Sequence, residues 1–219
     1  MLLCCFASAL FCGLSNTNIL VGFSLLAIGC FLHIVAKGIL IRNVVLCNEG
    51  IYGIVRHPYY LANYVIDTSF CVLSANLYLL LLYPFFFFWA YGPTLRKEEK
   101  YLATQHGDAF MNDSFEIPQV FPDIGSRNGW RRIFEGFSVR RITVKEYSRI
   151  ARFLSMSFAI LLIHELKRGG LEGLRHLLLP AKHDYNEFVF LLLTGILLGI
   201  SAVLSHIAHG KRDKGLHGS

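Results

Sequence analysis

Long runs of apolar residues recur along this chain and constrain its fold more than any other feature. Hydrophobic residues make up 54% of the 219 residues, charged residues make up only 16%, and the mean hydropathy is +0.47. Soluble domains carry about 25% charged residues, so the missing charge indicates segments that lie in lipid. We therefore expect an all-α fold, a polytopic bundle of transmembrane helices.

The apolar runs predict about six membrane spans. They cover residues 2–14, 19–36, 58–73, 77–91, 150–163 and 188–206. The first run is short for a span, which needs about 20 residues. Because it also lacks the basic start of a signal peptide, we interpret it as a short first helix. A tight turn at residues 74–76 should join the third and fourth spans.

The net charge of +6 is distributed unevenly over the predicted loops. With the N-terminus inside, the outer loops receive only four basic residues, Lys167, Arg168, Arg175 and Lys182. This asymmetry follows the positive-inside rule and predicts an integral membrane protein. It also places residues 46–57 and 96–149 on the same cytoplasmic face, where they can meet. Such charge is typical of helix flanks at a lipid bilayer, so we expect no nucleic-acid partner.

Six cysteines lie in the first third of the chain, mostly inside apolar runs. They are Cys4, Cys5, Cys12, Cys30, Cys47 and Cys71. No pair has the C-x-x-C spacing of a zinc or redox site, and no His-Cys cluster accompanies them. We therefore expect small buried residues and no metal site.

The second half of the chain adds a basic segment to the predicted spans. Residues 127–152 mix basic and apolar side chains, as an amphipathic segment against anionic headgroups would. A solvated linker is the alternative, since the apolar spacing is only roughly helical. Residues 171–179 predict a second interfacial helix, ended by Pro180.

One polar motif interrupts the apolar pattern, Arg56-His57-Pro58-Tyr59-Tyr60. Proline suits the first turn of a helix, where its missing N–H costs nothing, so His57 should cap the third span. The free N–H groups and the positive dipole end of that helix favour a carboxylate or phosphate there. In the alternative interpretation, Arg56 and His57 are interfacial anchors and the tyrosines belong to an aromatic belt.

A pair of adjacent carboxylates, Glu98-Glu99, follows the fourth span. Neighbouring Arg96, Lys97 and Lys100 could neutralise them as a solvated cluster. Alternatively, a carboxylate there could bind a cation or ligand hydroxyls beside the Arg-His-Pro helix cap. A ligand with a carboxylate, an amine, ribose hydroxyls and a positive centre would use both groups.

The order of these motifs resembles the isoprenylcysteine carboxyl methyltransferase and phospholipid methyltransferase superfamily. The resemblance covers residues 46–122, about a third of the chain. The residues that carry it are the run 50–60, the following pair of hydrophobic helices, Glu98-Glu99, Leu102, His106-Gly107-Asp108 and Ile117-Pro118.

The resemblance implies a cytoplasm-facing pocket for S-adenosylmethionine and methyl transfer to a lipid-like or prenylated membrane substrate. Residues 1–125 would form the methyltransferase core, with the cofactor-binding segment at 44–108. Residues 126–219 would add the basic interfacial segment and two further membrane helices. The implied cofactor-binding residues are Leu46, Cys47, Tyr52, Arg56, His57, Pro58, Tyr59, Tyr60 and Glu98.

The acceptor side departs from the family pattern. The family's substrate-orienting arginine stands a full turn before the glutamate, where this chain has Thr94. Arg96 and Glu99 are therefore the candidate catalytic residues. An NADPH-dependent membrane sterol or steroid reductase is an alternative, although its relatives place a glycine and an acid where this chain has residues 61–63. A non-catalytic membrane scaffold is a third interpretation.

Overall fold

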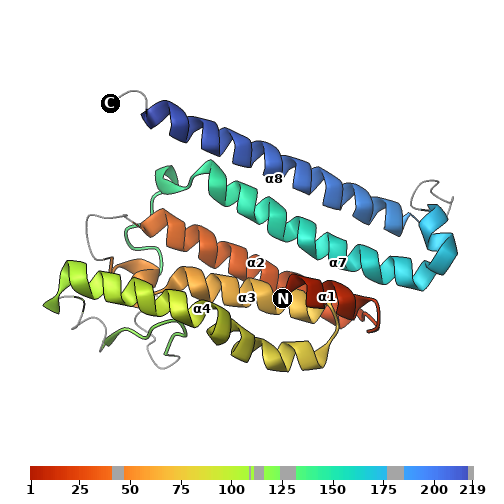
Figure 1. The fold of residues 1–219 in the computed structure, drawn as a ribbon, viewed down its shortest axis with the longest axis horizontal. Coiled ribbons are helices and arrows are strands. Elements are labelled where there is room, and N and C mark those ends of the chain that lie inside the picture. The colour runs from red at the N-terminus through yellow and green to blue at the C-terminus, as the bar shows by residue number, and fades with distance from the viewer. Residues whose placement is uncertain (41–46, 109, 111–115, 124–131, 177–184, 217–219) are drawn as a thin grey trace. The chain divides into compact units, whose positions relative to one another are not determined.

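The computed structural model describes residues 1–40, 47–108, 110, 116–123, 132–176 and 185–216 (Figure 1). Every regular element within these residues is a helix, which confirms the predicted all-α class. The α-helices are α1 (Leu2–Ala9), α2 (Asn16–Ile39), α3 (Pro58–Leu73), α4 (Leu77–His106), α7 (Val144–His176) and α8 (Asn186–Leu216), and two short 3₁₀ helices are η1 (Gly50–Gly53) and η2 (Val139–Arg141).

Three segments are long and apolar enough to cross a membrane: Asn16–Ile39, Leu77–His106 and Asn186–His209. The helices α1 and α3 have only 8 and 16 residues, fewer than the roughly 20 that a perpendicular span needs. Helix α7 is long, but charged residues flank its apolar middle on both sides. Three candidate spans are therefore present in the described residues, and the count of six is not confirmed.

The helix ends refine the predicted boundaries. The turn at residues 74–76 is confirmed, with Ala75 at a φ of +56° between α3 and α4. Helix α7 begins before the predicted residue 150, because the Glu146 carboxylate accepts hydrogen bonds from the Thr143 N–H and hydroxyl and so stabilises an earlier first turn. Within α7 the backbone kinks at Gly170. The helix resumes there, where the second interfacial helix was predicted, and the predicted end at Pro180 lies outside the described residues.

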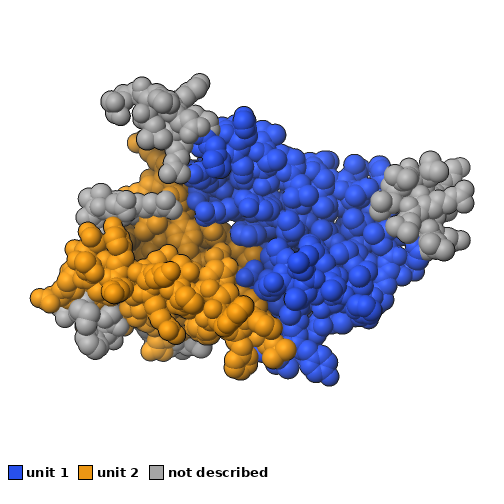
Figure 2. All heavy atoms as spheres, viewed as in Figure 1, with its two compact units in different colours: residues 1–26, 67–81, 143–219 blue, residues 27–66, 82–142 orange. Residues whose placement is uncertain are grey.

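The chain divides into two compact units, one of residues 1–26, 67–81 and 143–219, the other of residues 27–66 and 82–142 (Figure 2). In the first unit α7 packs along α8. Hydroxyl groups join the two helices, since Ser148 and Ser201 each donate to the other's carbonyl at 2.8 and 2.9 Å. Interhelical hydrogen bonds of this kind hold helices together where lipid removes the hydrophobic driving force.

The second unit contains the motif residues and is held together by a close approach of α2 to α3. A Cβ atom at Gly29 would lie 2.5 Å from the Ile66 side chain and 3.2 Å from the Ala62 carbonyl oxygen, so the approach requires glycine. Nearer the end of α2, the buried His33 ring meets the Tyr59 ring edge-on, with centroids 4.9 Å apart. These contacts fix the start of α3 against α2.

Candidate functional site

Helix α3 starts where the sequence predicts. Pro58 is its first residue, and the His57 carbonyl accepts the N–H of Tyr60 at 3.0 Å and of Leu61 at 3.3 Å. The prediction that His57 caps this helix is therefore confirmed. Both His57 and Pro58 are buried, so the cap is a part of the packed unit.

The segment that follows α4 pairs with the two residues before Pro58. The backbone N–H of Arg56 donates to the Pro118 carbonyl at 2.9 Å, and that of His57 donates to the Gln119 carbonyl at 3.0 Å. The Arg56 side chain adds a bond from Nε to the Ile117 carbonyl at 3.0 Å. Sequence reasoning missed these three carbonyls, although Ile117-Pro118 was part of the motif pattern.

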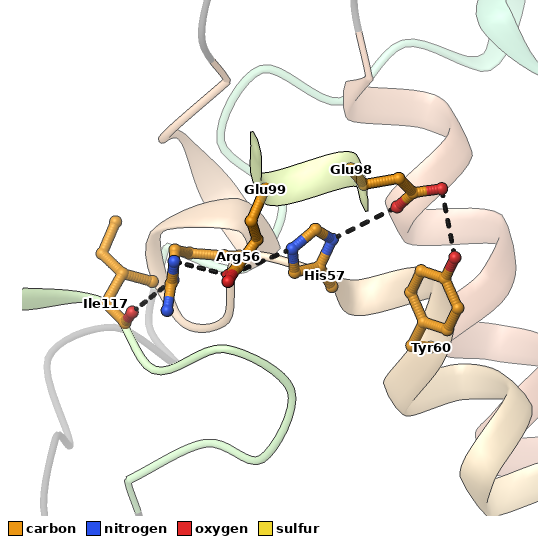
Figure 3. A network of polar contacts seen from close by, with 6 residues as sticks. All are labelled: Arg56, His57, Tyr60, Glu98, Glu99 and Ile117. Carbon is orange, nitrogen blue, oxygen red and sulfur yellow. Dashed lines mark hydrogen bonds and ion pairs between the residues drawn. The ribbon is translucent and has the colours of Figure 1, made fainter. Parts of the chain in front are cut away.

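The two carboxylates of α4 reach the same cap (Figure 3). Arg56 Nη1 lies 2.6 Å from Glu99 Oε1. The His57 ring lies between the carboxylates, with Nε2 3.5 Å from Glu99 Oε1 and Nδ1 3.6 Å from Glu98 Oε2. The Tyr60 hydroxyl donates to Glu98 Oε1 at 3.1 Å. The structure thus brings Arg56, His57, Tyr60, Glu98 and Glu99 together in one polar cluster.

The two carboxylates differ in their surroundings. The Glu99 side chain is 23% exposed and pairs with Arg56, which is 16% exposed. Of the alternatives that the sequence leaves open, neutralisation by Arg96, Lys97 and Lys100 does not describe Glu99, whose ion-pair partner is Arg56. The Glu98 side chain is 49% exposed, so it is the carboxylate that a ligand can reach.

The ring nitrogens of His57 have no hydrogen-bond partner at ordinary distance among the described residues. Both ring nitrogens contact carboxylate oxygens at 3.5 and 3.6 Å, longer than the 2.7–3.2 Å of an N–H···O hydrogen bond. Burial lowers the pKa of His57, and the positive charge of Arg56 acts in the same direction. Glu99 and Glu98 act against this shift without reversing it. His57 is therefore neutral near pH 7, with one nitrogen as donor and the other as acceptor.

The lowered pKa of His57 predicts a pH-dependent stability. Below its ordinary value of 6.5, the unfolded chain binds a proton that the folded chain does not. The contribution of His57 to the free energy of unfolding should therefore fall as the pH decreases from about 7, by at most about 1.4 kcal/mol per pH unit. Thermal unfolding of the detergent-solubilised protein against pH measures it. His57→Gln should remove this slope, and an unchanged slope would contradict the assignment.

A file of aromatic rings leads away from the polar cluster. The Tyr60 ring meets His57 at 5.8 Å and Tyr91 at 5.4 Å between centroids. Phe87 lies 4.9 Å from Tyr91 and 5.1 Å from Tyr64. Ring faces attract cations, so the polar end of this file suits a positively charged ligand group.

The other predicted site residues lie around this cluster. Tyr52 is buried in η1, and its hydroxyl donates to the Ala36 carbonyl of α2 at 3.3 Å. Cys47 is half-buried before η1, and Leu46 lies outside the described residues. Arg96 is exposed. It stands two residues before Glu98 and so about 200° around the helix from it, and no described contact joins it to the cluster.

Comparison with protein-family models, curated proteins and solved structures finds no match. The described residues also contain no group of three or more His, Cys, Asp or Glu side chains that could hold a metal ion.

Proposed function

We propose that this chain is an S-adenosylmethionine-dependent methyltransferase that acts on a lipid-like or prenylated acceptor in the membrane. The observation that supports this proposal is the single cluster formed by the Arg56-His57 helix cap and the Glu98-Glu99 pair. The resemblance requires these two motifs to lie together, although about forty residues separate them in the sequence.

The residues present fit the proposed cofactor. Glu98 is exposed enough to accept hydrogen bonds from ribose hydroxyls or an ammonium group. The His57 ring, whose nitrogens lie beyond ordinary hydrogen-bond distance of the two glutamates, offers one N–H donor to a ligand carboxylate. The Tyr60 ring offers a π face to a sulfonium. When bound, S-adenosylmethionine would supply an electrophilic methyl group to an acceptor nucleophile, and the C–S bond would break with the thioether S-adenosylhomocysteine as the leaving group.

The tasks left to the protein are positioning and the exclusion of water. Arg56, held by Glu99 and the Ile117 carbonyl, fixes the cap on which His57 stands. A carboxylate or thiolate acceptor needs no general base. An amine acceptor must lose a proton, and Glu98 is better placed to take it, because Glu99 is occupied by Arg56.

The acceptor and the orientation follow from the membrane character of the chain. Helix α4 carries both carboxylates and exposes many apolar side chains along the rest of its length, so we propose that a lipid-like acceptor enters from the bilayer. The bias of basic residues supports a site that faces the cytoplasm. The proposed topology of the chain includes six membrane spans in total.

Cofactor binding by the purified protein in detergent tests the proposal. His57→Ala and Glu98→Ala should each weaken S-adenosylmethionine binding by roughly 10- to 100-fold, since a hydrogen bond to a charged group contributes about 1.5–3 kcal/mol. Glu116→Gln is the matched control, because Glu116 is exposed and outside the cluster. Isothermal titration calorimetry gives the dissociation constants.

The same titrations separate the alternative functions. Binding of NADPH instead of S-adenosylmethionine would favour a sterol or steroid reductase. Binding of neither would favour a scaffold. Equal affinities of wild type, His57→Ala and Glu98→Ala would place the cofactor elsewhere and overturn the site.

A further inference from the structure

The C-terminal end of α2 is capped by a residue far along the chain. The last carbonyls of a helix have no partner within it. Arg141 Nη1 donates to the Ile39 carbonyl at 2.9 Å and to the Gly38 carbonyl at 3.3 Å. The backbone N–H of Ser138 also donates to the Gly38 carbonyl, at 2.9 Å. A positive charge at this end also complements the helix dipole.

Arg141 also closes the turn that precedes it. The same Nη1 atom donates to the Gly136 carbonyl at 2.8 Å. Gly136 has a φ of +74°, and the carbonyl oxygens of the neighbouring Glu135 and Ile133 lie against Gly50, the first residue of η1. One side chain therefore links the end of α2 to the turn formed by residues 132–138.

The 3₁₀ helix η1 is held between these two partners. On one side the Tyr52 hydroxyl donates to the Ala36 carbonyl, and the Ile39 side chain lies against Gly50. On the other side lie the carbonyls of the turn. Ile54 and Val55 are buried, and Val55 N–H donates to the Ile51 carbonyl at 3.1 Å. A shift of η1 would therefore be passed on to the next residue, Arg56.

We infer that Arg141 is a positioning residue for the proposed cofactor site. It fixes the end of α2 and the 132–138 turn, which together hold η1 and so set the positions of Tyr52, Arg56 and His57. This inference rests on the proposed function. It also gives the basic segment of residues 127–152 a role besides lipid contact. Its described residues 132–141 form a turn and η2, which dock on the end of α2, and only its last residues, from Val144, belong to α7.

The experiment compares Arg141→Gln with Arg140→Gln. The second variant removes the same charge at an exposed neighbouring position. Arg141→Gln should raise the dissociation constant and the KM for S-adenosylmethionine about tenfold and leave kcat at saturating cofactor nearly unchanged. Arg141→Lys should recover part of the affinity, because lysine keeps the charge without the planar fork. Arg140→Gln should behave as wild type. Unchanged cofactor affinity in folded Arg141→Gln would overturn the inference.

Amide hydrogen exchange provides a readout that does not depend on the cofactor. The amides of Tyr52, Ile54 and Val55 should exchange faster in Arg141→Gln than in Arg140→Gln. If the wild type binds no S-adenosylmethionine, the proposed function fails, and these amides still decide whether Arg141 holds η1. If Arg141→Gln does not fold, Arg141→Lys takes its place, with a smaller increase expected. Equal exchange in the Arg141 and Arg140 variants would refute the positioning role.

Discussion

Replacing Gly50 with alanine is expected to lower the free energy of unfolding by about 3 kcal/mol and to disturb the site that follows it. Gly50 has a φ of +56°, a region that costs other residues roughly 1–2 kcal/mol. A Cβ atom there would also lie 2.6 Å from the Glu135 carbonyl oxygen and 2.6 Å from Ile39 Cδ1. Overpacking of this kind costs about 1–3 kcal/mol. Thermal or denaturant unfolding in detergent measures the loss.

Alanine substitutions at two other glycines separate the cost of the backbone conformation from the cost of overpacking. Gly107 has a φ of +53° but open space around its Cβ position, so Gly107→Ala should show the backbone cost of about 1–2 kcal/mol alone. Gly92 lies inside α4 with open space and no positive φ, and Gly92→Ala should be neutral or stabilising because alanine favours helices. A Gly50→Ala variant as stable as Gly107→Ala would mean that η1 does not pack against residues 133–135.

Removing the Arg56 side chain is expected to cost about 2 kcal/mol of stability. Arg56→Met leaves the Glu99 carboxylate without its partner at 2.6 Å and the Ile117 carbonyl without its donor. Breaking a fully buried ion pair costs about 3–5 kcal/mol, and the remaining exposure of 16% and 23% reduces this figure through solvent screening. The loss should be measurable by denaturant unfolding in detergent.

A double-mutant cycle isolates the contact between these two side chains. Arg56→Met, Glu99→Gln and the double variant should show a coupling free energy of about 1 kcal/mol, within the range for residues in contact. The Arg56→Met and Lys97→Gln pair serves as the control, because Lys97 is exposed on α4. The effects of these two substitutions on the free energy of unfolding should be additive. Strict additivity for Arg56 and Glu99 would show that the ion pair does not form in solution.

The sequence predicts the local geometry of the site better than its long-range contacts. The position of Pro58 suffices to place the start of α3 and the cap at His57, because proline at the first helical position is a local backbone effect. The meeting of this cap with α4 was expected from charge placement and from the order of the motifs. The partner of Glu99 was not expected, because three nearby cations, Arg96, Lys97 and Lys100, compete in the sequence and only the fold selects Arg56.

The contacts that the sequence does not reveal are those between backbone groups and distant segments. The Ile117, Pro118 and Gln119 carbonyls bind through main-chain atoms, which leave no signature in side-chain identity. Arg141 is one of several arginines in a basic segment, and nothing in its neighbourhood marks it as the cap of α2. Hydropathy likewise identified the apolar runs but not the end of α4, because its helix continues through charged residues to His106.

Methyl transfer by the purified protein tests the proposed function. The wild type in lipid nanodiscs is incubated with S-adenosylmethionine carrying a labelled methyl group and a total membrane lipid extract, and the organic phase is counted. The proposed function predicts label in the organic phase for the wild type and for Glu116→Gln, and a loss of at least tenfold for Glu98→Ala. Undiminished transfer by Glu98→Ala, or wild-type protein that neither binds the cofactor nor transfers label to lipid or to a prenylated acceptor, would contradict it.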